Sequence, residues 1–119
     1  MISSKYMQDF RAARETIEKS SRILIMSHRN PDGDSIGANL ALKRALEQQW
    51  GKTVTPACVD QLPENSAFLE GARAYVSDFN PNDFDLFMSV DCGAHYMPRF
   101  HEKYPDLLKK TPHFINIDH

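Results

Sequence analysis

The stretch ILIMSHRNPDGDSIGANLALKRAL, residues 23–46, joins a short apolar run, a polar loop and a helical pattern. Its apolar run, Ile23–Met26, is typical of a buried strand. The loop holds three potential metal ligands within seven residues, namely His28, Asp32 and Asp34. Apolar residues at helical spacing then predict a helix over about 35–49, which Gly51 can end. One strand–loop–helix unit therefore carries metal-binding residue types just beyond the end of a strand.

The rest of the chain continues this alternation of helices and strands. A helix over 4–20 is predicted, with an apolar stripe made of Tyr6, Phe10, Ala13 and Ile17. Further elements are predicted as strands Val54–Val59, Ala74–Val76, Phe84–Val90 and Phe114–Ile117, a helical turn over 64–71 and a helix over 97–110. Such alternation predicts an α/β fold, a Rossmann-like parallel sheet with helices on both faces. We expect a stripe of the strand over 84–90, made of Phe84, Leu86 and Met88, to lie in the core.

Composition limits the classes of protein that the chain can represent. Its 119 residues suit one domain, and 41% hydrophobic with 25% charged residues is an ordinary globular balance. A formal net charge of −2 argues against duplex DNA binding by bulk charge. The two cysteines, Cys58 and Cys92, form no CxxC pattern, which argues against a structural zinc site and fits a reducing cytoplasm. The sequence has neither the apolar core of a signal peptide nor a run long enough to cross a membrane.

Three of the predicted strands run directly into acidic residues or histidine. The strand over 23–26 leads to the loop, the strand over 84–90 leads to Asp91, and the strand over 114–117 leads to Asp118 and His119. Ligands bind at the carboxyl ends of strands in open parallel sheets, so neighbouring strands would bring these groups to one edge. Several carboxylates in one place repel each other unless cations lie between them. Imidazole with hard oxygen ligands suits Mn²⁺ or Mg²⁺, and two such ions are a recurring device for phosphoester hydrolysis.

Other interpretations of the loop fit less well. An EF-hand that starts at Asp32 would need an oxygen ligand and a glutamate where Ile36 and Lys43 stand. A P-loop would need Lys-Ser/Thr where Ala38 and Asn39 stand, and the dinucleotide pattern GxGxxG is missing. A simple turn remains the structural alternative, because PDGD is rich in turn formers. The acidic residues at two further strand ends favour the metal site.

The segments HRNPDGDSIGANLALKRAL, SVDCG and INIDH together resemble the DHH phosphoesterase superfamily over about residues 20–119. The resemblance is greatest to the oligoribonucleases that are also 3′-phosphoadenosine-5′-phosphate phosphatases. It implies two Mn²⁺ ions, with Mg²⁺ as an alternative. It implies five metal ligands, which are His28, Asp32, Asp34, Asp91 and His119. Among these, Asp34 and Asp91 would act in catalysis, while Asn30 and Asp118 would support the ligands or touch the substrate.

The resemblance also sets expectations for the whole protein. The family motif continues with a second histidine, a later aspartate and a C-terminal substrate-binding domain. Residues 1–119 are therefore expected to be the N-terminal part of a DHH domain, weakly active or inactive alone. The implied substrates are short RNA or nucleotide 3′-phosphates, and the implied setting is the cytoplasm, with no membrane partner and a homodimer as one arrangement of the parent. The alternatives are a cyclic-dinucleotide phosphodiesterase, a manganese pyrophosphatase and a non-catalytic module that binds metal or nucleotide.

Overall fold

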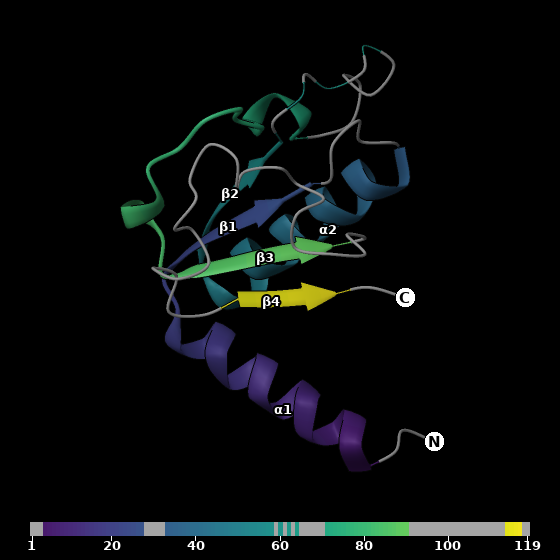
Figure 1. The fold of residues 1–119 in the computed structure, drawn as a ribbon, viewed down its shortest axis with the longest axis vertical. Coiled ribbons are helices and arrows are strands. Elements are labelled where there is room, and N and C mark those ends of the chain that lie inside the picture. Colours follow the sequence, from purple (N-terminus) through teal and green to yellow (C-terminus); the bar gives the residue numbers. More distant parts are fainter. Residues whose placement is uncertain are drawn as a thin grey trace.

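In a computed structural model, the protein is described over residues 4–27, 33–58, 60, 62, 64, 71–90 and 114–117. These residues form two long helices, four strands and two short 3₁₀ helices (Figure 1). The elements are α1 Ser4–Lys19, β1 Arg22–Met26, α2 Gly33–Trp50, β2 Thr53–Ala57, η2 Ala72–Ala74, η3 Pro81–Asp83, β3 Leu86–Val90 and β4 Phe114–Ile117. Within this described part, neither helix is long and apolar enough to span a membrane.

The four strands form one parallel sheet in the order β2–β1–β3–β4. The central strand β1 is buried from Ile23 to Met26, as its uninterrupted apolar run predicts for a strand covered on both faces. Because all four strands run the same way, their carboxyl ends lie at one edge of the sheet, where the arrowheads point in Figure 1. The predicted α/β class, with a parallel sheet flanked by helices, is confirmed.

Helix α2 lies against the sheet through one stripe of its surface. Its buried residues recur at helical spacing and are Ser35, Ile36, Asn39, Leu40 and Leu46. The helix ends where the sequence predicts, since Gly51 has a φ of 64°, a left-handed conformation that suits glycine. The N–H of Gly51 donates to the carbonyl of Glu47 at 3.2 Å, and the N–H of Lys52 donates to that of Leu46 at 3.2 Å. These bonds satisfy carbonyls of the last helical turn.

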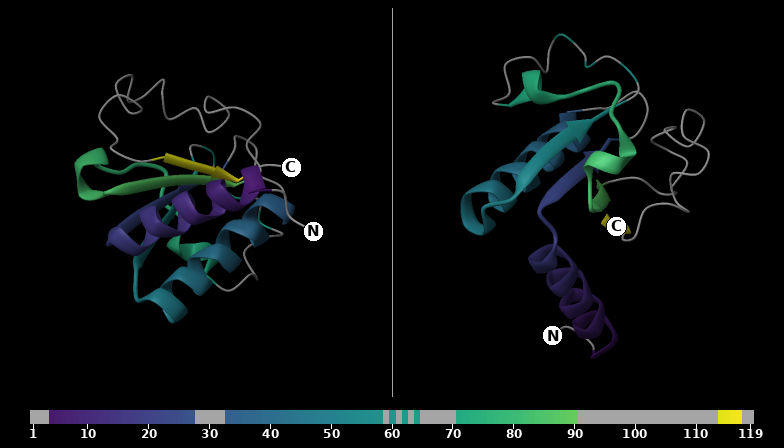
Figure 2. Two further views of the ribbon diagram at one scale, coloured as in Figure 1. Left: turned by 90° about the horizontal axis from the view of Figure 1, so that it is seen from below. Right: turned by 90° about the vertical axis from the view of Figure 1, so that its left-hand side faces the viewer.

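The sheet has a different cover on each face. On one face, Leu46 of α2 and Ile17 of α1 contact a single apolar cluster, built on Ile23, Ile25, Val54, Leu86 and Met88. Both helices therefore lie on the same side of the sheet (Figure 2, left). On the other face, Phe79 and Phe84 pack against Phe87 of β3, with ring centroids 6.3 and 6.1 Å away.

Helices on the second face stay a prediction, because both long helices of the described residues lie on the first face. The segment between η2 and β3 covers the second face with turns and η3, because Asn80, Pro81 and Asn82 favour turns over a long helix. All three residues of the predicted core stripe pack with the core, but Phe84 is half-buried on the second face whereas Leu86 and Met88 are buried on the first. The predicted helix over 97–110 lies outside the described residues.

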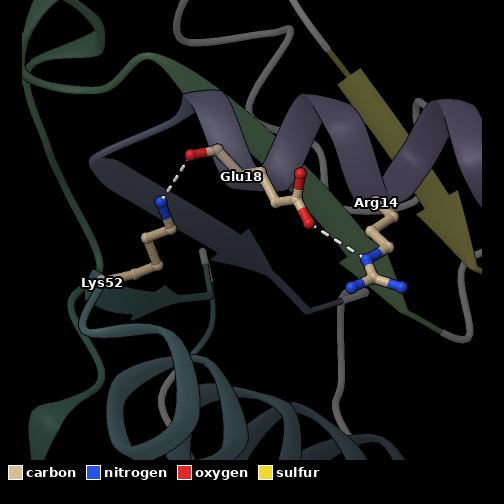
Figure 3. Close-up of polar contacts among 3 residues, drawn as sticks. All are labelled: Arg14, Glu18 and Lys52. Carbon is tan, nitrogen blue, oxygen red and sulfur yellow. Dashed lines mark hydrogen bonds and ion pairs between the residues drawn. The ribbon is translucent and has the colours of Figure 1, made fainter.

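Helix α1 is tied to the sheet mainly by its C-terminal end. Ile17 is half-buried against the core, whereas Tyr6 and Phe10 of the same predicted stripe are each 58% exposed. The Lys52 ammonium donates to the backbone carbonyl of Glu18 at 2.9 Å, and Arg14 Nε donates to the Glu18 carboxylate at 3.0 Å (Figure 3). The N-terminal half of the helix extends away from the sheet (Figure 1).

One carboxylate joins the amino ends of β1 and β3. The two oxygens of Asp85 accept the backbone N–H groups of Ser21 and Arg22, at 2.8 and 2.9 Å. The N–H of Asp85 in turn donates to the carbonyl of Arg22 at 3.0 Å. These bonds hold the two strands in register where they begin.

Several element bounds differ from the sequence predictions, among them the start of β3 at Leu86. Strand β2 ends at Ala57, and no strand forms over the predicted stretch Ala74–Val76, in which Ala74 ends η2 and Tyr75 is extended. Only Val76 pairs there, in a single parallel bridge to Ala57. Short strands next to a glycine and a 3₁₀ helix have too few residues for a pattern to define them. The helical turn predicted over 64–71 lies largely outside the described residues.

Candidate functional site

The strands β1, β3 and β4 end side by side. Met26 at the end of β1 pairs with Ser89 of β3, and Val90 at the end of β3 pairs with Ile117 at the end of β4. Neighbouring strands lie about 4.8 Å apart, so the three carboxyl ends span roughly 10 Å of one edge. In the sequence, each of these ends is followed directly by a segment with predicted metal ligands. The order β1–β3–β4 is the neighbour relation that the metal-site hypothesis requires.

The predicted site residues themselves fall almost entirely beyond what the structure describes. Asp34 lies in the first turn of α2, and its side chain is outside the described residues. The other six, His28, Asn30, Asp32, Asp91, Asp118 and His119, also lie outside them. In the part of the chain that is described, no group of three or more His, Cys, Asp or Glu side chains could hold a metal ion. The predicted convergence of the ligands therefore stays a prediction.

A layer of polar side chains lies immediately beneath this edge. Ser27, which follows β1, is fully buried, as are Asn39 of α2 and Ser89 of β3. Asn39 Nδ2 donates a hydrogen bond to Ser27 Oγ, and Ser27 Oγ lies 2.9 Å from the hydroxyl of Tyr75. The Ser89 hydroxyl donates to Asn116 Oδ1 across the neighbouring strand at 2.7 Å. Deeper in the sheet, the buried residues of β1 and β3 are all apolar.

Sequence reasoning did not identify these polar residues. A signal was present, because serine ends the apolar runs ILIMS and LFMS, and Asn39 occupies a position on the buried stripe of α2. Buried polar groups cost free energy unless they form hydrogen bonds. Ser27 and Ser89 have such partners, while Asn39 Oδ1 has no partner among the described residues.

Two titratable groups near the carboxyl ends are affected by burial. Burial raises the pKa of the Tyr75 hydroxyl, and hydrogen bonds with Ser27 and Asn39 offset part of that rise. Burial likewise raises the pKa of the Cys58 thiol, which lies just after β2. Neither group is therefore prepared to act as an anion at neutral pH, since a nucleophilic thiol needs a lowered pKa.

A surface hollow of about 340 Å³ lies elsewhere, along the flank of α2. It is lined by Leu40, Ala41, Lys43, Arg44, Glu47, Gln48 and Gly71. An ion pair between Lys43 and Glu47, with 2.7 Å between Nζ and Oε1, crosses this lining. The hollow contains none of the predicted site residues, so the strand ends remain the candidate site.

Comparison with known families agrees with the motifs. Residues 22–119 match the model of the DHH family, N-terminal domain. The match covers most of the chain, which therefore belongs to the DHH family, the phosphoesterase superfamily that the motifs indicate. No curated protein matches the chain.

A solved structure shares the fold. It is the crystal structure of an exopolyphosphatase-related protein from Bacteroides fragilis, which is 24% identical and superposes with a TM-score of 0.81. The similarity covers 95% of this chain but 35% of that protein, so the chain spans about a third of its relative's length. At this level of identity the relative establishes the fold.

Proposed function

We propose that the whole protein is a manganese-dependent phosphoesterase that hydrolyses short oligoribonucleotides or nucleotide 3′-phosphates. Membership of the DHH family supports the hydrolase class. The observation that carries the proposal is the parallel order β1–β3–β4, because each of these strands is followed in sequence by a motif with carboxylate or imidazole groups. A site at this edge follows the rule for ligands of open parallel sheets.

The proposed ligands have the chemistry that Mn²⁺ prefers. The set of three carboxylates and two imidazoles comprises His28, Asp32, Asp34, Asp91 and His119. Hard oxygens with imidazole suit Mn²⁺ and exclude the softer thiolate-bound metals. Such ions, when bound, lower the pKa of water and neutralise charge on a phosphate. Asp34 and Asp91 would hold them between two strand ends, while Asn30 and Asp118 would orient neighbouring groups.

Helix α2 adds a favourable field for a phosphate. The helix begins at Gly33, at the carboxyl edge of the sheet, and runs for 18 residues. Its amino end carries about half a positive charge, which attracts anions placed before the first turn. A phosphoryl group bound at the strand ends would lie close to this positive end. The motifs that follow β1, β3 and β4 would supply the remaining contacts.

The test is hydrolysis by the whole protein after removal of metal with EDTA and addition of Mn²⁺ or Mg²⁺. We expect cleavage of a short RNA or of a nucleotide 3′-phosphate, and a loss of at least about 100-fold in Asp91→Asn and Asp34→Asn. The control is Asp9→Asn, because Asp9 is an exposed acid on α1 and the charge change is the same. Full activity of Asp91→Asn, or activity that survives EDTA, would refute the proposal.

The structural relative supports a second candidate substrate. That protein is described as exopolyphosphatase-related, and a phosphoanhydride presents the same phosphoryl chemistry to the metals. Inorganic pyrophosphate and polyphosphate therefore belong in the same assay, together with a cyclic dinucleotide. Preference for a phosphoanhydride over RNA would favour the pyrophosphatase alternative.

A further inference from the structure

The group formed by Ser27, Asn39 and Tyr75 joins three separate parts of the fold. Ser27 follows β1, Asn39 lies in the second turn of α2, and Tyr75 follows η2. Asn39 Nδ2 donates to Ser27 Oγ, which lies 2.9 Å from the Tyr75 hydroxyl. Ser27 and Asn39 are fully buried, so water does not compete for these hydrogen bonds.

Backbone hydrogen bonds to the end of β2 also hold Ser27 and the residue next to Tyr75. The N–H of Ser27 donates to the carbonyl of Ala57 in β2 at 2.8 Å. Next to Tyr75, Val76 pairs with β2 through two backbone hydrogen bonds, from its N–H to Pro56 and from the N–H of Cys58 to its carbonyl, both at 3.0 Å. The three side chains therefore meet from rigid supports, and their hydrogen bonds determine the position of the residue that ends β1.

An apolar side chain in place of Asn39 would fit the apolar surroundings of this position better than an amide does. Ile36, Leu40, Ala72 and Tyr75 already form an apolar cluster around α2 and η2. A leucine in place of Asn39 would extend that cluster and would leave no amide oxygen without a partner among the described residues. Apolar contacts have no direction, whereas hydrogen bonds fix both distance and orientation. A buried polar group that costs stability is therefore expected where a geometry has to be defined.

The position that this group defines is the start of the first motif. His28 is the next residue after Ser27, and consecutive Cα atoms are about 3.8 Å apart. We infer that Asn39, with Ser27 and Tyr75, is a positioning residue that sets where the first-motif loop leaves β1. This inference rests on the proposed function, because it assigns His28 and Asp32 of that loop to the metal site. Groups that support metal ligands in this way change metal affinity when they are replaced.

The test compares Mn²⁺ affinity and thermal stability in the same variants of the protein. Asn39→Leu keeps the number and branching of the side-chain heavy atoms and removes both polar atoms, and Tyr75→Phe removes one hydroxyl. We expect the dissociation constant for Mn²⁺ to rise about 10-fold or more in Asn39→Leu. A smaller rise is expected in Tyr75→Phe, because the hydrogen bond between Asn39 and Ser27 remains. In both variants, the loss of Mn²⁺ affinity should be larger than any loss of thermal stability would explain.

A matched control separates positioning from simple destabilisation. Leu46→Ala alters the same buried stripe of α2, seven residues and roughly 10 Å further along the helix. We expect it to lower the melting temperature while the Mn²⁺ dissociation constant stays within about 2-fold, since the loop is untouched. If Asn39→Leu does not fold, Tyr75→Phe decides the question alone.

The outcomes distinguish the inference from the proposed function. Unchanged Mn²⁺ affinity in Asn39→Leu and Tyr75→Phe, beside an unaltered protein that binds Mn²⁺, would overturn the positioning role only. An equal loss of affinity in Leu46→Ala would also overturn it, because any destabilisation would then have the same effect. An unaltered protein that binds neither Mn²⁺ nor Mg²⁺ would refute the proposed function, and the inference with it.

Discussion

Replacing Asp85 by alanine should lower the free energy of unfolding by about 1–2 kcal/mol. The carboxylate accepts the N–H groups of Ser21 and Arg22, at 2.8 and 2.9 Å. Hydrogen bonds to a charged group contribute about 1.5–3 kcal/mol each where they are buried. Ser21 and Arg22 are exposed, so water can replace the lost acceptor and the expected sum is smaller. The remaining loss reflects weaker alignment of β1 with β3.

Urea unfolding measured by circular dichroism gives this difference directly. The matched control is Asp83→Ala, because Asp83 is an exposed acid two residues away whose side chain makes no hydrogen bond within the described residues. The free energy of unfolding of Asp85→Asn should lie between those of Asp85→Ala and Asp83→Ala, because the asparagine amide keeps one acceptor oxygen. The reasoning is wrong if Asp85→Ala and Asp83→Ala unfold within about 0.3 kcal/mol of each other, a difference typical of ordinary surface substitutions.

The same variant also separates stability from the site. Asp85 acts at the amino ends of the strands, about five residues and roughly 16 Å from the carboxyl edge. We therefore expect Asp85→Ala to bind Mn²⁺ with unchanged affinity once folded. A large change in affinity would mean that strand register, rather than local side chains, controls the metal site.

Three further predictions follow from described side chains. Because the folded pKa of Tyr75 lies above its ordinary value of 10.0, the unfolded state loses the proton first, so stability should fall as the pH rises past that value. Tyr75→Phe should show less of this decline in unfolding measured between pH 9 and 11. Cys58 is 2% exposed and its pKa is raised, so its thiol should react slowly in the native chain. In a variant whose other cysteine, Cys92, is replaced by serine, iodoacetamide at pH 8 should modify Cys58 far more slowly without urea than in urea. Gly71→Ala should lower the free energy of unfolding by about 1 kcal/mol or more, because the φ of Gly71 is 87° and a Cβ there would lie 3.3 Å from Leu40. In the same urea assay, Gly37→Ala inside α2 should raise the free energy of unfolding by about 0.5–1 kcal/mol, because a Cβ at Gly37 would have nothing within 4 Å.

Local patterns predicted the elements that are long or strongly apolar. The run Ile23–Met26, the helix that Gly51 ends and the strand Phe114–Ile117 were all found from periodicity and turn residues. Periodicity works for such segments because burial repeats with the geometry of the element itself. It was less informative around Ala74–Val76, where a 3₁₀ helix and one bridge replace the predicted strand.

For the candidate site too, local sequence patterns predicted some features and missed others. The ligand types and their positions after strand ends were read from the sequence. Their convergence stays a prediction, because Asp91, Asp32 and their partners lie outside the described residues. The polar group beneath the edge was missed, since Ser27 and Tyr75 are 48 residues apart and no local pattern relates them.

The sequence by itself determined the class of fold and the family, because both depend on short segments whose residue types and spacing carry the information. Only the tertiary structure decided the strand order β2–β1–β3–β4, the placement of both long helices on one face and the bonds of Asp85 to β1. These features depend on contacts between residues far apart in the chain. Such contacts form when the whole core packs and each buried polar group finds a partner, a condition that no single segment of sequence contains.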